Sequence, residues 1–153
     1  MRSLKLTQTV LVCLLLIQSV GALGGGLAFI LAPDGSIMGM PTEPLRAHSP
    51  FDDYLIPGLI LFLVLGVFPA FTAWALYARP DWSWPQRLNA YPDQYWAWSF
   101  ATYVGFGLVI WIAMQTLFIR MADPLQTAYA LLGTAIVAWA LLPSVRNHFQ
   151  NIP

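Results

Sequence analysis

The residues able to do acid–base or metal chemistry are few, and four of them share one polar segment. Glu43, His48, Asp52 and Asp53 fall within eleven positions of the chain. Zinc sites depend on several nitrogen or sulfur ligands, and this segment offers one histidine. Asp52 and Asp53 are neighbours at an expected helix start, so their carboxylates point in different directions rather than forming a catalytic pair. We therefore expect a solvated acidic loop here and no metal site.

The rest of the chain adds no recognisable active site. His48 and His148 are the only histidines, and we expect them on opposite faces of a membrane, too far apart to hold a haem between them. The single cysteine, Cys13, excludes an intrachain disulfide. Phosphate-binding loops, nucleophile elbows and zinc-protease motifs are also missing from the sequence. The sequence predicts no cofactor and no catalytic residues, and hence a protein that is not an enzyme.

Composition indicates the elements that any site would depend on. Of the 153 residues, 58% are hydrophobic and 9% are charged, against about 25% charged in a soluble domain. The formal net charge of zero provides no basic surface for nucleic acid, and the expected surroundings are a lipid bilayer and other membrane-protein subunits. Four uncharged stretches of 28, 25, 26 and 22 residues exceed the roughly 20 residues that cross a bilayer. We predict an all-α membrane protein, a single domain over residues 1–153, with four transmembrane helices at about 6–32, 51–78, 94–119 and 124–145.

Local signals refine the helix boundaries. Ser49 to Asp52 reads as a capping box that starts the second helix, and Asp123 is placed to cap the fourth. Pro69 lies deep in the second stretch and predicts a kink. The first stretch also fits a cleaved signal peptide, but its apolar run continues to Ala32 and favours a retained helix.

Basic residues predict the orientation of an up-down bundle. Cytoplasmic loops of membrane proteins are enriched in Lys and Arg. One expected side holds five of them and the other side holds two, which places both termini in the cytoplasm. The five are Arg2, Lys5, Arg79, Arg87 and Arg146, and the two are Arg46 and Arg120. Aromatic residues crowd the same side as the five, as an interfacial belt or, alternatively, as an aromatic box for a ligand. They are Trp82, Trp84, Tyr91, Tyr95, Trp96 and Trp98.

Small and polar residues inside the spans predict helix packing. Gly21 and Gly25 form a small-xxx-small pair, which lets two helix backbones approach closely. Gln18 and Gln115 are the central amides, and each is expected to hydrogen-bond a neighbouring helix.

The segment LAPDGSIMGMPTEPLRAHSPFDDYLIPGLILFLVLGVFP joins a turn, a Gly-Met-Pro sequence, an S-P-F cap and an IPGLIL helix. Over residues 32–66 this order resembles a group of small four-helix bacterial membrane proteins. The resemblance implies a multi-pass protein of the bacterial inner membrane. It implies no activity and no functional residues.

Two functions are expected from these features. The first is a non-enzymatic membrane protein, either an accessory or structural subunit or a free-standing bundle. In it, the outer-surface residues Arg46, His48, Asp52 and Asp53 contact a partner or a lipid headgroup. The alternative is a carrier or binder of a lipophilic small molecule or lipid within the bundle. That binding site is expected to be lined by aromatic residues such as Tyr103, Trp111 and Trp139. A membrane enzyme with catalytic groups in the interfacial loops ranks third.

Overall fold

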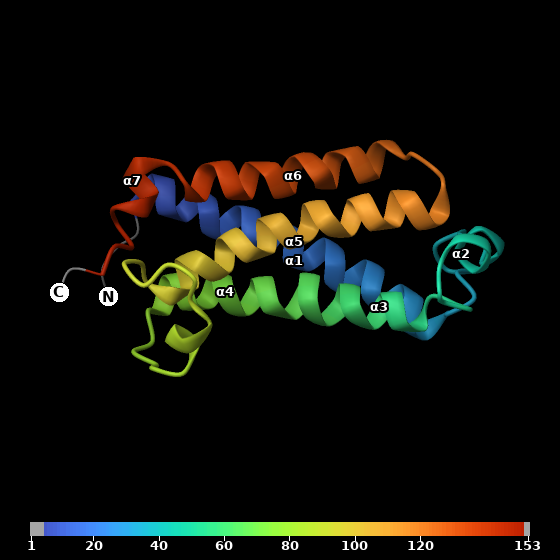
Figure 1. The fold of residues 1–153 in the computed structure, drawn as a ribbon, viewed down its shortest axis with the longest axis horizontal. Coiled ribbons are helices and arrows are strands. Elements are labelled where there is room, and N and C mark those ends of the chain that lie inside the picture. Colours follow the sequence, from blue (N-terminus) through green and yellow to red (C-terminus); the bar gives the residue numbers. More distant parts are fainter. Residues whose placement is uncertain (1–4, 152–153) are drawn as a thin grey trace.

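The computed structural model describes residues 5–151, and within that range the protein is helical with no β-strand. Figure 1 shows long helices running side by side, with consecutive ones pointing in opposite directions. Their order is α1 (Leu6–Leu31), α2 (Glu43–His48), α3 (Leu55–Phe62), the π-helical η1 (Leu63–Val67), α4 (Phe68–Ala78), the 3₁₀ turn η2 (Pro85–Leu88), α5 (Trp96–Ile119), α6 (Pro124–Ala140) and α7 (Pro143–Arg146).

Three of these helices are long and apolar enough to cross a membrane. They are α1, the continuous helix Leu55–Ala78 formed by α3, η1 and α4, and α5. The expected fourth span over 124–145 is wrong in its length, because α6 has 17 residues and ends at Ala140. Leu142 is extended, with ψ 133°, as is usual for a residue before proline, and Pro143 begins the separate helix α7.

The first capping prediction is wrong and the second is confirmed. The second helix begins at Leu55 instead of residue 51, and the Asp53 carboxylate accepts a hydrogen bond from the Leu55 N–H at 2.9 Å. The Ser49 hydroxyl instead closes the end of α2 by donating to the Leu45 carbonyl. Asp123 caps α6 as expected, accepting from the Leu125 N–H at 2.7 Å in a reciprocal box with Gln126.

Pro69 follows η1, the π-helical segment of the second long helix. Because proline has no N–H, the Leu65 carbonyl one turn earlier lacks its usual helical donor. The Gln18 side chain of α1 donates to that carbonyl at 3.2 Å, and the Ser19 hydroxyl donates to the Gly66 carbonyl at 2.8 Å. The expected hydrogen bond from Gln18 to a neighbouring helix is therefore confirmed.

One end of the molecule is tightly packed. There, the Trp139 indole donates to the Thr7 carbonyl at 2.8 Å and the Gln8 amide donates to the Ser144 carbonyl at 3.2 Å, which joins α1 to α6 and α7. The largest hydrophobic cluster lies at this end and includes the buried side chains of Trp96 and Trp98. At the opposite end α2 lies beyond the long helices, in the connection between α1 and α3 (Figure 1). The candidate site, a cavity between the helices, lies toward that α2 end.

Candidate binding cavity between the helices

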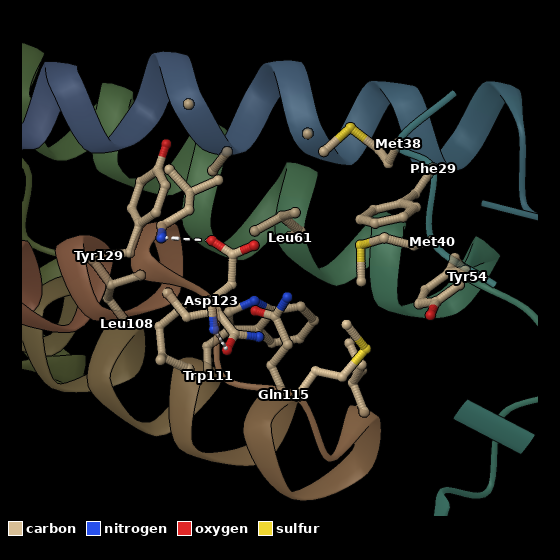
Figure 2. Close-up of a pocket in the computed structure, with 18 of the residues that line it drawn as sticks. Phe29, Met38, Met40, Tyr54, Leu61, Leu108, Trp111, Gln115, Asp123 and Tyr129 are labelled. Carbon is tan, nitrogen blue, oxygen red and sulfur yellow. Dashed lines mark hydrogen bonds between the residues drawn. The ribbon is translucent and has the colours of Figure 1, made fainter. Parts of the chain in front are cut away.

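A cavity of about 320 Å³ lies between α1, α5, α6 and the loop at 38–44. Its walls are mainly apolar and aromatic, and Figure 2 shows the side chains that converge on it. The apolar walls include Phe29, Leu61, Leu108, Trp111, Ile112 and Ile119. A volume in this range is that of a small-molecule site, which lies typically between about 300 and 1,000 Å³.

A second, smaller space adjoins the first. It measures about 60 Å³, extends toward α2 and α3, and shares Phe29, Tyr54, Trp111 and Gln115 with the larger cavity. The additional residues that line it are all apolar, among them Pro57, Ile60 and Phe118. The two spaces together form a largely apolar region at the α2 end of the helices.

The loop at the α2 end is held in place beside the cavity. Tyr54 stacks on Phe29 with ring centroids 4.7 Å apart, and its hydroxyl donates to the Pro41 carbonyl at 2.9 Å. Burial raises the pKa of the Tyr54 phenol, with a smaller contribution from the charge of Glu43, so the hydroxyl keeps its proton as a donor. Gly39 adopts a left-handed φ of +64° between Met38 and Met40, and all three line the cavity.

Methionines gather at this loop-side part of the cavity. Met38, Met40 and Met121 all line it, from two different loops. Methionine is unbranched and polarizable, so it adapts its shape to varied apolar ligands. The spacing of these methionines along the chain gives no sign of their meeting, so the sequence alone did not identify them.

Polar groups occupy two places in the cavity wall. Asp123 and Gln126 lie at the start of α6, where their side chains cap that helix, and Gln115 lines the cavity from α5. Gln18 and Tyr129 also line the cavity, and Gln18 is buried. Among the described residues, no Lys or Arg side chain lines the cavity, so it offers no cation to an anionic ligand.

The four predicted outer-surface residues do not line the cavity. The side chains of three of them make hydrogen bonds within α2, the loop that follows it and the start of α3. Arg46 Nε donates to the Asp52 carbonyl at 2.6 Å, and His48 Nδ1 lies 3.0 Å from the Pro44 carbonyl. Asp53 caps α3. Within residues 5–151 no three potential ligands from His, Cys, Asp and Glu gather to hold a metal ion. The contact of the four outer-surface residues with a partner or a lipid headgroup stays a prediction.

Of the three aromatic residues expected to line a ligand site, the structure places one in the cavity. Trp111 lines it. The Tyr103 hydroxyl instead donates to the Leu88 carbonyl and accepts from the Ala90 N–H, and the Trp139 indole joins α6 to Thr7.

Gly21 and Gly25 both border the cavity. A close backbone approach between α1 and the second long helix lies one residue further along, at Gly26. A Cβ atom there would lie 2.7 Å from the Phe62 backbone nitrogen, whereas a Cβ at Gly25 would meet only Leu61 Cδ2 at 3.4 Å. Gly25 therefore leaves room beside the cavity.

Comparisons of the chain with protein-family models, with curated proteins and with solved structures find no match.

Proposed function

We propose that this protein is an integral membrane protein that binds a lipophilic small molecule in the cavity between α1, α5 and α6. The observation that carries the proposal is a cavity of about 320 Å³ with apolar walls and a few polar groups. Such a combination is typical of small-molecule sites, where apolar contact provides affinity and a few polar groups fix orientation. A carrier or a storage protein for such a molecule needs no catalytic residues.

The membrane arrangement that we propose has four spans with both termini in the cytoplasm. α6, with 17 residues, is about 26 Å long and lies at the lower limit for a spanning helix. It packs along α5, where Gly105 and Gly133 bring the two backbones together. Lys5, Arg79, Arg87 and Arg146 flank the ends of the helices opposite α2, which supports that end as the cytoplasmic one. Arg2, which contributes to the same count, lies outside the described residues.

Exposed aromatic side chains support an interfacial position for the end opposite α2. Trp74, Trp82 and Trp84 are about half exposed, and Trp82 lies 5.5 Å from Trp74 and 6.3 Å from Trp84 between ring centroids. Amphipathic rings of this kind settle at the level of lipid headgroups. A bacterial inner membrane is the location implied by the resemblance of residues 32–66.

The role of an accessory subunit stays a prediction. Apolar side chains exposed on α1 and α5, such as Ile17, Val20 and Ile110, fit lipid chains as well as a partner helix. The cavity, by contrast, favours the binding of a small molecule over a role as an accessory subunit.

A pair of glycine variants tests the proposed binding function. Gly25→Leu projects a side chain beside the cavity, whereas a Cβ atom at Gly24 has no neighbour within 4 Å and Gly24→Leu serves as the matched control. Protein purified in lipid nanodiscs is extracted, and co-purifying lipophiles are quantified by mass spectrometry. We expect a compound enriched in wild type and in Gly24→Leu and depleted in Gly25→Leu. Equal recovery from all three proteins, all folded, would contradict the proposal.

A further inference from the structure

Gln18 provides a hydrogen-bond acceptor that the protein leaves unused. Its side chain is 1% exposed and borders the cavity. The amide nitrogen donates to the Leu65 carbonyl, but Oε1 has no hydrogen-bond partner among residues 5–151. A buried acceptor without a partner destabilises the folded protein, because it has lost its hydrogen bond to water. A donor supplied by a ligand would remove that cost.

A second polar group, the Tyr129 hydroxyl, lies beside Gly21, which is about one helical turn from Gln18 on α1. The Tyr129 ring rises from α6 toward α1 (Figure 2), and its hydroxyl lies so close to Gly21 that a Cβ atom there would overlap it. Gln18 and Gly21 are three residues apart on α1 and therefore share a face of that helix. Gln18 and Tyr129 both line the cavity, and we call the part of its wall that they form the inner polar end.

Resting on the proposed binding function, we infer that the ligand is a neutral lipophilic alcohol whose hydroxyl binds at the inner polar end, between Gln18 and Tyr129. A hydroxyl group is both a donor and an acceptor. It can donate to Gln18 Oε1 and accept from the Tyr129 hydroxyl. A ketone or an ether oxygen satisfies only the second of these groups.

The charge and shape of the cavity support the same class of ligand. An anionic headgroup would meet no Lys or Arg among the residues that line the cavity, and it would be repelled by Asp123. Gln18 and Phe29 are eleven residues apart on α1, which corresponds to about 16 Å along the helix axis. An apolar tail attached to the hydroxyl would extend over that distance past Trp111 and Ile112 toward Phe29.

The test compares dodecanol with dodecyl methyl ether. The two probes share the apolar chain, and only the alcohol can donate a hydrogen bond. Equilibrium binding is measured on the full-length protein in lipid nanodiscs, with empty nanodiscs to subtract partitioning into lipid. Wild type is expected to bind the alcohol about three- to tenfold more tightly than the ether, the effect of one net hydrogen bond.

Three variants identify the groups responsible. Gln18→Met removes the acceptor and Tyr129→Phe removes the phenol hydroxyl, and each is expected to abolish most of the preference for the alcohol. Ser19→Ala removes the adjacent hydrogen bond to the Gly66 carbonyl while keeping Gln18, and it should retain the preference.

The outcomes separate the two proposals. Equal binding of alcohol and ether by wild type would overturn the inference and keep the binding function, as expected if water bridges the two groups. A preference that survives in both Gln18→Met and Tyr129→Phe would also overturn it. Binding of neither probe above empty nanodiscs would count against the inference and the proposed function together. If Gln18→Met fails to fold, the ratio in wild type and the Tyr129→Phe result still decide.

Discussion

The absence of side chains at three glycines allows α1 and the second long helix to pack closely. A Cβ atom at Gly26 would lie 2.7 Å from the Phe62 nitrogen, and one at Gly58 would lie 2.7 Å from Phe29 Cβ. At Gly66, a Cβ atom would lie 2.8 Å from Leu23 Cδ2. Lipid removes the hydrophobic drive between helices, so close backbone packing provides much of their association.

The first prediction concerns Gly26. Gly26→Ala places a methyl group against the Phe62 backbone, which cannot rotate away, and should lower the free energy of unfolding by about 1–3 kcal/mol. Gly24→Ala is the matched control, because its Cβ has no neighbour within 4 Å and alanine favours a helix by about 1 kcal/mol over glycine. Thermal unfolding in a mild detergent measures both. A Gly26→Ala protein as stable as Gly24→Ala would show that the helices are further apart.

The glycine cluster was visible in the sequence, but its contact face was not. Gly21 and Gly25 have the spacing of a packing motif, and both border the cavity, while Gly26 makes the tight contact. Neighbouring glycines differ by about 100° around a helix, since 3.6 residues complete a turn. The rotation of α1 against its partner decides which of them is at the seam, and periodicity does not fix that rotation.

The second prediction concerns Asp93 and the stability of the folded protein at low pH. A hydrogen bond from the Gln94 amide holds the pKa of Asp93 below its usual 3.8, with help from Arg146, whose guanidinium lies 3.5 Å away. The charged form is therefore favoured in the folded protein. Its contribution to stability is present above pH 3.8 and is lost as the pH falls through the lower, folded pKa.

The measurement is hydrogen exchange at the Asn151 N–H, which donates to the Asp93 carbonyl. Protection should fall as the pH drops below 3.8, after correction for the intrinsic exchange rate. Asp93→Asn should show a flatter dependence. Identical pH profiles in the two proteins would remove Asp93 from the attachment of the C-terminal segment.

At the scale of elements, the start of α6 depends on one carboxylate. Asp123 caps the helix and also borders the cavity. Asp123→Ala should destabilise the protein by about 1 kcal/mol because the Leu125 N–H loses its partner. Asp123→Asn should retain most of the stability, since asparagine caps equally well. Unfolding in detergent compares them, and equal losses in both variants would assign the effect to charge instead of capping.

Helix starts and breaks differed in how well the sequence predicted them. Asp123-Pro124 is a complete local signal, and α6 begins there. Ser49 to Asp52 carries a similar signal, yet the Ser49 hydroxyl closes α2 and the next helix starts at Leu55. The short α2 was not expected, because a helix of six residues that includes Pro44 is too short to show a periodicity. Pro69 predicted an irregularity, but the side chains that donate to carbonyls of the π-helical segment, Gln18 and Ser19, come from another helix.

At the scale of the whole molecule, the helices pack closely at one end and enclose the cavity toward the other. α1 contacts α6 and α7 at the end opposite α2, through Trp139 and Gln8. Toward α2, Phe29 and Tyr54 on one side and Trp111 and Ile119 on the other border open space. Helix lengths and apolar stretches were readable from composition, whereas this space depends on how the helix pairs meet. Trp111 was among the expected ligand contacts, and the methionines were not.

The last prediction concerns how the molecule lies in the membrane. Ser36 and Ser83 are exposed residues in the loops at opposite ends of the helix Leu55–Ala78, which is about 36 Å long. The excess of Lys and Arg at the Ser83 end predicts that this end faces the cytoplasm. In a Cys13→Ser background, Ser36→Cys should react with a membrane-impermeant maleimide in intact cells, and Ser83→Cys should react only after the cells are permeabilised. Labelling of Ser83→Cys in intact cells would reverse the orientation or place both loops outside. Because the cavity lies toward the α2 end, the same experiment decides which half of the bilayer the cavity faces.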